Sequence, residues 1–527
     1  MTTPLVPGQV TASLARWRAR ASRAVRRLRR RVRRMGPATS ARSTTAYAVR
    51  AAVLLQDGAA RGLAPHWDQV RLTEAGGVQQ LESADRPGLL LLQLPDSLVG
   101  HWWAEDAIGW AAERGVPIVL WDTSTGGVPG PDRAEVLRLG ALAGQLATVS
   151  QSRVSDYAAD LPGAAVWHLP EATDPARHLP GGRTGARRRV EVLPDAEDAA
   201  HPGRSDQPTP ATAYDLAAAG VALVSAPNPA LELDLDGAVR VADPGESRLA
   251  AAALRRQPEV RDRQAHLARR AVLLRHTWAE RAGQVLRQLE LPAPAPDRSV
   301  SAVVPTVRPW QLDHVLETLA AQRHPDVELV LVTHGFQAPA AEVLARAADL
   351  GLDHVQVLHA ASDLTLGACL NLGVAAASGR YTAKMDDDNL YGPHYLLDLV
   401  LAFEHTSAQV VGKWAHYVHL TGSDAVLLRF AGQEHREVDL VQGGTIVMPT
   451  DLLRELGFAD LPRRVDTTLL ERVRAGDGRI WSADRFNFVS RRAADATGHT
   501  WGITDQELLT RASSVVFYGD PTRHTTL

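Results

Sequence analysis

Between Val300 and Met385 the sequence alternates short apolar runs with segments of helical periodicity, and this alternation restricts the possible folds more than any other feature. The apolar runs have the length of strands, and the segments between them repeat apolar residues every three or four positions. The runs are Val300–Thr306, Val327–Val332, Val355–His359 and Tyr381–Met385. Such alternation predicts an α/β domain with a mostly parallel sheet, in which ligands bind where the strands end.

A similar alternation precedes this region, and a proline-rich segment separates the two. The earlier strand-like runs are Gly88–Leu94, Val116–Trp121, Gln145–Val149, Ala164–His168 and Val221–Ser225. They predict a second, Rossmann-like α/β region with a doubly wound parallel sheet over residues 40–290. Residues 291–298 contain three prolines and should form a semi-rigid linker. The later domain is therefore predicted to occupy residues 299–527.

Composition sets further limits. With 527 residues the chain exceeds one ordinary core, and its apolar share of 45% and charged share of 22% are typical of globular proteins. No apolar run approaches the ~20 residues that span a bilayer. Cys369 is the only cysteine, which excludes an intramolecular disulfide and a cysteine-based zinc site. These features predict a cytoplasmic protein without a transmembrane segment.

Positive charge is concentrated at the start of the chain. Residues 1–35 contain eleven arginines and no acidic residue, although the net charge of the whole chain is −3. Apolar residues recur there at helical spacing, at Leu14, Trp17, Ala21, Val25, Leu28, Val32 and Met35. The pattern predicts a basic amphipathic helix within residues 1–38. Its residues 11–35 can lie on an anionic membrane, peripherally at the inner face of the plasma membrane.

Two alternatives remain open for this basic segment: a solvated arginine-rich tail, and an arm that binds nucleic acid. The remainder of the chain is acidic and has no basic stripe interleaved with aromatic residues. We therefore expect no nucleic-acid partner.

The acidic triplet Asp386, Asp387 and Asp388 directly follows the strand predicted at Tyr381–Met385. Carboxylates so close together raise one another's pKa unless a cation compensates, and oxygen ligands suit Mg²⁺ or Mn²⁺. Such an ion would bridge the phosphates of a nucleotide diphosphate. A solvated loop, or a helix N-cap with acidic first-turn residues, would explain the triplet equally well.

The surroundings of the triplet resemble glycosyltransferase family 2, which comprises inverting enzymes with the GT-A fold. The resemblance covers about residues 299–500 and rests on short motifs that are specific only in combination. They are Val303–Thr306, Leu319–Pro325, Gly367 with Asn371–Ala375, and Ser378–Tyr381 before the triplet.

The resemblance implies roles for individual residues. Asp386 and Asp388 would be the carboxylates on the side of the metal, a Mn²⁺ or Mg²⁺ ion, and Lys384 would offset diphosphate charge. The residues that it places at the nucleotide are Pro305, Thr306, Gly367, Asn371 and Asp387.

The end of the second strand departs from the family pattern. Family members usually carry a pair of acidic residues before a glycine, whereas this chain has Thr333 and His334 before Gly335. Thr333 and His334 can hydrogen-bond a base or a ribose. The alternative is that they are polar loop residues without such a role.

The later motifs of the resemblance imply residues that contact the sugars, the metal and the acceptor. Asp466 resembles the family's acidic residue at the start of a helix and is the candidate base that takes the acceptor proton; an N-cap role is the alternative. Gly443 and Gly444 resemble the loop that borders the donor and acceptor sugars, where glycine lets the backbone approach a ring. His499 resembles a late metal ligand of some relatives, and Trp501 would stack on a sugar face.

The first half resembles a reduced GT-B glycosyltransferase of the spore-maturation type. The matching segments are Ile118–Asp122, Thr209–Ser225 and Arg275–Ala282. The second lobe looks incomplete between His178 and Pro208, and alanines at 217–219 replace polar positions. We expect this half to scaffold or bind rather than catalyse, with a second active transferase as the alternative.

Together these features predict an inverting transfer of sugar from a nucleotide diphosphate sugar to a glycan, lipid-linked or protein acceptor, in cell-envelope or surface glycan synthesis. One alternative is a catalytically inactive protein that binds sugar nucleotides or serves as a scaffold. Another is a metal-dependent nucleotidyl- or phosphotransferase, which would be expected to carry a glycine-rich phosphate loop that this sequence lacks.

Overall fold

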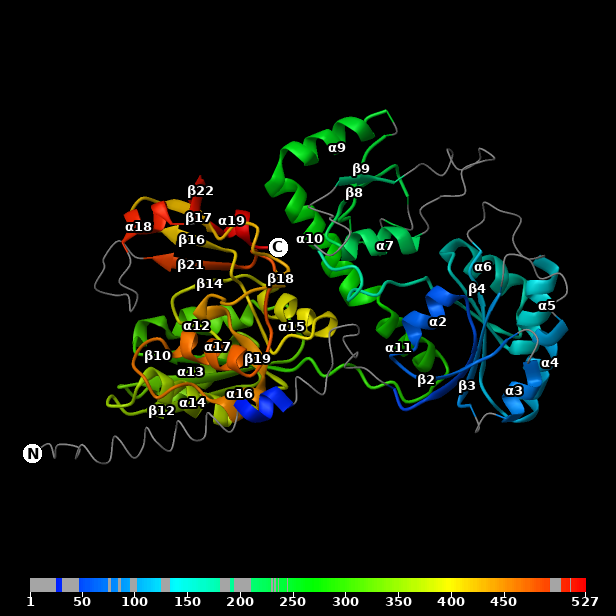
Figure 1. Ribbon diagram of the computed structural model, residues 1–527, viewed down its shortest axis with the longest axis horizontal. Coiled ribbons are helices and arrows are strands. Elements are labelled where there is room, and N and C mark those ends of the chain that lie inside the picture. Colours follow the sequence, from blue (N-terminus) through cyan, green and yellow to red (C-terminus); the bar gives the residue numbers. More distant parts are fainter. Residues whose placement is uncertain are drawn as a thin grey trace, which may run out of the picture. The chain divides into compact units, whose positions relative to one another are not determined.

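The chain folds into two compact units, which we call the N-terminal unit (residues 42–296) and the C-terminal unit (residues 1–41 and 297–527). Both are α/β bodies with parallel sheets, as predicted (Figure 1). The computed structural model describes residues 25–30, 47–73, 77–83, 87–94, 102–124, 133–180, 190–193, 210–228, 231, 234–235, 237–243, 245–492, 504–511 and 513–527. No helix in these ranges is long and apolar enough to cross a membrane.

An eight-stranded sheet forms the centre of the C-terminal unit, in the order β12-β11-β10-β13-β19-β15-β20-β18. The first four of these are parallel neighbours, while β19 pairs antiparallel with both β13 and β15. The strands are β10 (Val300–Thr306), β11 (Val327–His334), β12 (Val355–Ala360), β13 (Tyr381–Lys384), β15 (Val410–Gly412), β18 (Arg436–Glu437), β19 (Val447–Pro449) and β20 (Ile480–Ser482).

Helices lie between these strands in the chain, and local signals set where they begin. Helix α14 starts after Thr365, whose hydroxyl accepts a hydrogen bond from the Ala368 amide. It can lie close to β10 because Gly373 has no side chain; a Cβ there would stand 2.4 Å from Val303. The helices are α12 (Leu312–Ala320), α13 (Ala340–Asp349), α14 (Leu366–Ala376), α15 (Tyr395–His405), α16 (Thr450–Leu456) and α17 (Val465–Ala475), with the 3-10 turns η2 (Pro309–Gln311) and η3 (Gly443–Thr445).

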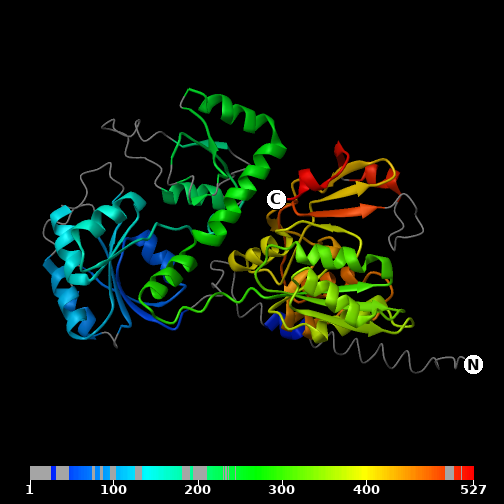
Figure 2. The same cartoon turned by 180° about the vertical axis from the view of Figure 1, so that it is seen from behind.

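A second, five-stranded sheet lies beside the large one in both views of the C-terminal unit (Figures 1 and 2). Its order is β14-β21-β16-β17-β22. Strand β14 directly follows the acidic triplet and pairs with β21, so this sheet fixes one end of the triplet loop. Its elements are β14 (Leu390–Tyr391), β16 (His416–Leu420), β17 (Ala425–Arg429), β21 (Phe488–Arg492) and β22 (Ser513–Tyr518), with helices α18 (Asp505–Thr510) and α19 (Thr522–Thr525).

The N-terminal unit contains a six-stranded parallel sheet in the order β2-β1-β3-β4-β5-β6 and a three-stranded parallel sheet, β7-β8-β9. Helices α3 to α6 pack on one face of the six-stranded sheet, and α2 and α11 on the other. The strands are β1 (Arg50–Leu54), β2 (Asp68–Arg71), β3 (Leu89–Leu94), β4 (Ile118–Asp122), β5 (Gln145–Thr148), β6 (Ala165–His168), β7 (Val190–Val192), β8 (Ala222–Ser225) and β9 (Arg240–Val241). The helices are α2 (Asp57–Leu63), α3 (Gly77–Ser83), α4 (Trp102–Glu113), α5 (Arg133–Ala143), α6 (Gln151–Asp160), α7 (Pro210–Ala218), α9 (Ser247–Arg256), α10 (Pro258–Arg275) and α11 (Trp278–Gln288).

The distinctive segments Thr209–Ser225 and Arg275–Ala282 meet inside this unit. The ring of His276 stacks on Tyr214 with centroids 4.3 Å apart, and its Nδ1 accepts a hydrogen bond from Arg281 at 2.7 Å. Burial, and then the charge of Arg281, lower the pKa of His276 to about 4, so the ring is neutral at pH 7. Arg281 also donates to the carbonyl of Pro170 at 2.7 Å. These contacts join the two sheets of the unit.

The basic N-terminal segment enters the core of the C-terminal unit through Leu28. Residues 25–30 are helical, and Leu28 is 2% exposed in a core cluster that includes Leu470 and Val473. It fits against the turn after α17, where a Cβ on Gly476 would stand 2.7 Å from it. The Nε of Arg29 donates to the Ala475 carbonyl at 2.8 Å. The other members of the predicted stripe, apart from Val25, lie outside the described residues.

Replacing Leu28 with alanine should release this segment from the C-terminal unit. Truncation of a buried leucine costs about 2–5 kcal/mol, because a cavity replaces its packing. Limited trypsin digestion of the full chain, followed by mass spectrometry, should then cut after Arg29 faster than in the wild type. Val25→Ala, a smaller truncation at a partly buried position, serves as the control. Equal cleavage rates in Leu28→Ala and the wild type would contradict the docking.

Candidate functional site

The acidic triplet lies at the carboxyl end of the parallel strands of the large sheet. Lys384 is the last residue of β13, and the amide of Met385 still donates to the Val303 carbonyl of β10 at 3.1 Å. Thr306, at the end of β10, is in register with Thr333 of β11. The triplet and the ends of three neighbouring strands therefore share one edge of the sheet.

The ammonium group of Lys384 holds two carboxylates in one site. Its Nζ lies 2.8 Å from Oδ1 of Asp386 and 3.5 Å from Oδ1 of Asp466, and it donates to the Gly443 carbonyl at 3.2 Å. Lys384 is buried. Burial alone would lower its pKa, but the charges of Asp386 and Asp466 outweigh it and hold the pKa above its ordinary value. The lysine is therefore charged at neutral pH.

Two glycines allow the carboxylates to approach the turn η3. A Cβ on Gly443 would stand 2.2 Å from Oδ2 of Asp466, and one on Gly444 would stand 2.4 Å from Oδ2 of Asp386. Real atoms do not approach so closely, so any other residue would displace a carboxylate. The predicted glycine pair thus brings the backbone against Asp386 and Asp466.

Asp386 is oriented by residues that sequence reasoning did not single out. Its amide donates to the Tyr391 hydroxyl at 2.8 Å, and that hydroxyl donates to the Gly444 carbonyl at 3.0 Å. The side-chain amide of Asn389 donates to Oδ2 of Asp386 at 3.2 Å. An Asn-Leu-Tyr sequence after a strand looks like an ordinary loop, so only the pairing of β14 reveals these contacts.

Arg308 is a further member of the site that was not predicted. Its guanidinium lies 2.8 Å from Asp387 and 2.7 Å from Asp388, and Asp387 also accepts from the Thr306 hydroxyl at 2.5 Å. Burial raises the pKa of Asp387, while the hydrogen bond of Thr306 and the charge of Arg308 act against the rise. In the sequence, the only indication of this role is that Arg308 is a cationic residue two positions after the first strand.

Asp386 and Asp388 fit a hard divalent ion. Their side chains are 32% and 27% exposed, whereas that of Asp387 is 10% exposed and also accepts a hydrogen bond from Thr306. A site that offers carboxylate oxygens suits Mg²⁺ or Mn²⁺. His499, the predicted additional ligand, and Trp501 lie outside the described residues.

Asp466 lies in the first turn of α17, and its environment suits a proton acceptor. Burial, with Asp386 as a further contribution, raises its pKa, and Lys384 opposes the rise. The N-cap of α17 is Arg464, in the left-handed conformation with φ 61°, so the N-cap role considered for Asp466 is wrong.

The remaining predicted residues fall into two groups. Pro305 and Thr333 lie at the same strand ends as Thr306, and the Thr333 hydroxyl donates to Leu358 at 3.2 Å. Within the described part of the chain, Nε2 of His334 is buried without a hydrogen-bond partner. Gly367 and Asn371 instead contact the loop before α17. Asn371 exchanges two hydrogen bonds with the Phe458 backbone, at 3.0 and 2.8 Å, and a Cβ on Gly367 would stand 1.7 Å from the Ala459 oxygen.

Residues 301–450 match the sequence profile of Glycosyl transferase family 2. An uncharacterized glycosyltransferase of Nostoc sp. is 28% identical over 116 residues, which are 22% of this chain and 35% of that protein. The chain thus spans about a third of the length of this curated relative.

Solved structures also resemble the chain. Staphylococcus aureus TarS 1–349 in complex with UDP-GlcNAc is 16% identical and aligns with 37% of this chain and 58% of its own, with a TM-score of 0.30. The mannosyltransferase PcManGT from Pyrobaculum calidifontis, in complex with GDP-Man and Mn²⁺, is 17% identical over 41% of this chain and 64% of its own, also with a TM-score of 0.30.

Gly444→Ala should weaken binding of Mn²⁺ by about 10- to 100-fold, the usual effect of disturbing a residue that supports a metal ligand. The added methyl group would displace Asp386. Electron paramagnetic resonance of free Mn²⁺ in a titration of the protein measures the change. Gly109→Ala, where a Cβ has open space, is the matched control and should bind like the wild type. If Gly444→Ala binds Mn²⁺ with unchanged affinity, Asp386 is not a ligand of the metal.

Proposed function

We propose that the C-terminal unit is an inverting glycosyltransferase, which moves a sugar from a nucleotide diphosphate sugar to an acceptor hydroxyl. The observation that carries this proposal is the convergence of Asp386 and Asp466 on one buried lysine. The family match over residues 301–450 supports it and ends before Asp466. Asp466 thus lies outside the matched residues, yet its carboxylate reaches the edge of the large sheet where the triplet lies.

The donor side would be formed by the strand ends and the triplet. Asp386 and Asp388 would hold the divalent ion, which when bound neutralises charge on the diphosphate leaving group. Pro305, Thr306, Thr333 and His334 would contact the nucleoside, as predicted. Arg308 already neutralises Asp387 and Asp388, so it would also limit their repulsion of the diphosphate.

The acceptor side would be served by Asp466. An inverting displacement requires a base on the face opposite the leaving group, and Asp466 would take the proton of the attacking hydroxyl. A carboxylate whose pKa is raised is a stronger base than an ordinary one, and the charge of Lys384 opposes this rise and so favours the ionised form. Gly443 and Gly444 would keep the edge of η3 free of side chains, so that a sugar ring could approach the backbone beside the two carboxylates.

Our proposal for the setting of the reaction is based on the basic segment and the N-terminal unit. Arg26, Arg27, Arg29 and Arg30 are exposed beside the docked Leu28, and they would contact an anionic membrane from the cytoplasmic side. We propose a cell-envelope or surface glycan as the product. The N-terminal unit would be a reduced GT-B-like scaffold, because the residues of its most distinctive segments are used to pack one part of the unit against another.

A panel of nucleotide diphosphate sugars with Mn²⁺ or Mg²⁺ tests the reaction, with release of nucleotide diphosphate as the readout. One donor should be turned over in the presence of metal, and Asp388→Asn should abolish the metal response. Asp466→Asn should lower kcat by about 10²- to 10⁴-fold, the usual contribution of a general base. Asp451→Asn, at an exposed position on α16, is the control. Donor binding without turnover would favour an inactive binding protein instead.

The pH dependence of turnover tests the base directly. Activity should rise with pH through the pKa of Asp466, above the ordinary 3.8 of an aspartate, because only the ionised form accepts a proton. The charge of Lys384 lowers this pKa, so Lys384→Met should move the acid limb of kcat/KM to higher pH, and Lys384→Arg should keep it in place. If the acid limb of kcat/KM lies at the same pH in Lys384→Met as in the wild type, Asp466 is not the group that titrates.

A further inference from the structure

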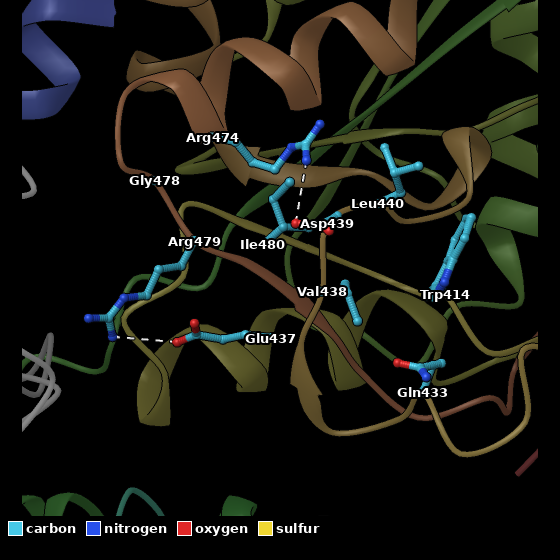
Figure 3. Close-up of a pocket in the computed structure, with 10 residues that line it drawn as sticks. All are labelled: Trp414, Gln433, Glu437, Val438, Asp439, Leu440, Arg474, Gly478, Arg479 and Ile480. Atoms are coloured by element: carbon cyan, nitrogen blue, oxygen red, sulfur yellow. Dashed lines mark ion pairs between the residues drawn. The ribbon is translucent and has the colours of Figure 1, made fainter.

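A pocket of about 590 Å³ lies in the C-terminal unit, apart from the carboxylates described above. Its walls come from Trp414, Gln433, residues 437–440, Arg474 and residues 478–480 (Figure 3). Strands β18 and β20 and the end of α17 therefore contribute to it, and the proposed function assigns it no role.

The charged side chains of the pocket neutralise one another. Arg474 lies 3.4 Å from Asp439, and Arg479 lies 3.6 Å from Glu437. Two cations and two anions leave no net charge to attract a phosphate or a metal ion. Arg479 also donates to the Ser407 hydroxyl at 2.5 Å, and the remaining donors and acceptors of these four side chains can hydrogen-bond a ligand. The polar groups thus suit a neutral ligand that both donates and accepts hydrogen bonds.

Trp414 gives the pocket a rigid aromatic surface. Its ring is stacked on Phe430, with centroids 4.0 Å apart and planes 9° apart, and its amide donates to the Ser482 hydroxyl at 3.0 Å. Figure 3 shows its side chain at one end of the lining residues, with the Arg479–Glu437 pair at the other end. A sugar ring has apolar C–H faces and a polar edge. An aromatic ring held in place, in the same pocket as polar side chains, can therefore stack on its face and hydrogen-bond its hydroxyls.

The pocket is connected to the candidate catalytic residues through two elements. Asp466 and Arg474 lie near opposite ends of α17, about 12 Å apart along its axis at 1.5 Å per residue. Lys413, which precedes Trp414, accepts a hydrogen bond at its carbonyl from the Gln442 amide, next to Gly443. A sugar in the pocket would therefore be remote from the hydroxyl that Asp466 deprotonates.

We propose that this pocket is a distal acceptor subsite, which binds a neutral sugar residue within an oligosaccharide whose end lies at Asp466. The acceptor role rests on the proposed transferase function, whereas the binding of sugar does not. Trp414 would stack on the ring, and the two charged pairs with Gln433 would bind its hydroxyls.

Saturation-transfer NMR titrations of the full chain with malto-, cello-, manno- and chitohexaose, each beside its monosaccharide, test the proposal. At least one hexasaccharide should bind more tightly than its monosaccharide. Trp414→Ala should weaken that binding by about tenfold, the effect of one lost aromatic contact. Asp439→Asn, at a side chain that is 83% exposed, should weaken it as well, because the substitution removes a charged hydrogen-bond acceptor. Tyr518→Ala, an exposed aromatic residue on β22, should not.

Hydrolysis of the nucleotide diphosphate sugar in the absence of an acceptor, measured on the same variants, separates the sugar-subsite proposal from the transferase proposal. Tyr518→Ala, which lies outside the pocket, should keep the wild-type rate. If no hexasaccharide binds, or if binding is equal in the wild type, Trp414→Ala and Asp439→Asn, the subsite is refuted. Binding that depends on Trp414 in a protein that turns over no donor would support the sugar site and refute the transferase.

Discussion

The candidate site depends on one buried ammonium group. Lys384 ends a fully buried strand, and its charge is stable there only because Asp386 and Asp466 lie beside it. Those carboxylates come from distant parts of the chain, one after β13 and the other in the first turn of α17. Because each charge compensates the others, the relative positions of the donor side and the base are set together. Removing Lys384 would leave the two carboxylates beside each other without a compensating charge.

The turn η3 and the second sheet complete this arrangement. Gly443 and Gly444 let the backbone reach the two carboxylates, and Tyr391 links the triplet loop to the Gly444 carbonyl. Strand β14, which carries Tyr391, is held by β21 of the five-stranded sheet. Both sheets of the C-terminal unit therefore help to position Asp386. This explains how three adjacent carboxylates can keep distinct surroundings: Asp387 faces Thr306 and Arg308, while Asp386 faces Lys384.

The sequence predicted the parts of this site that local patterns specify. Apolar runs identified the strands of the parallel sheet, and the triplet and the glycine pair stood out as short motifs. Arg308, Asn389 and Tyr391 act through pairings between distant segments, which no periodicity encodes. Gly367 and Asn371 were predicted to contact a nucleotide, yet their close contacts are with the loop at Phe458 and Ala459. They brace the segment that leads into α17, so their relation to Asp466 follows from the tertiary fold.

Segments that look functional in a sequence can also be required for packing. In the N-terminal unit, His276 and Arg281 have the residue types of a catalytic pair, but Arg281 donates to His276 and to backbone carbonyls, and the histidine is neutral. Leu28 gives a related result, because one residue of a predicted membrane-facing stripe lies in the core of the C-terminal unit. The docked leucine fixes the adjacent arginines to the turn that ends α17. A surface that binds those arginines would consequently be held in a defined orientation to α17, which carries Asp466 in its first turn.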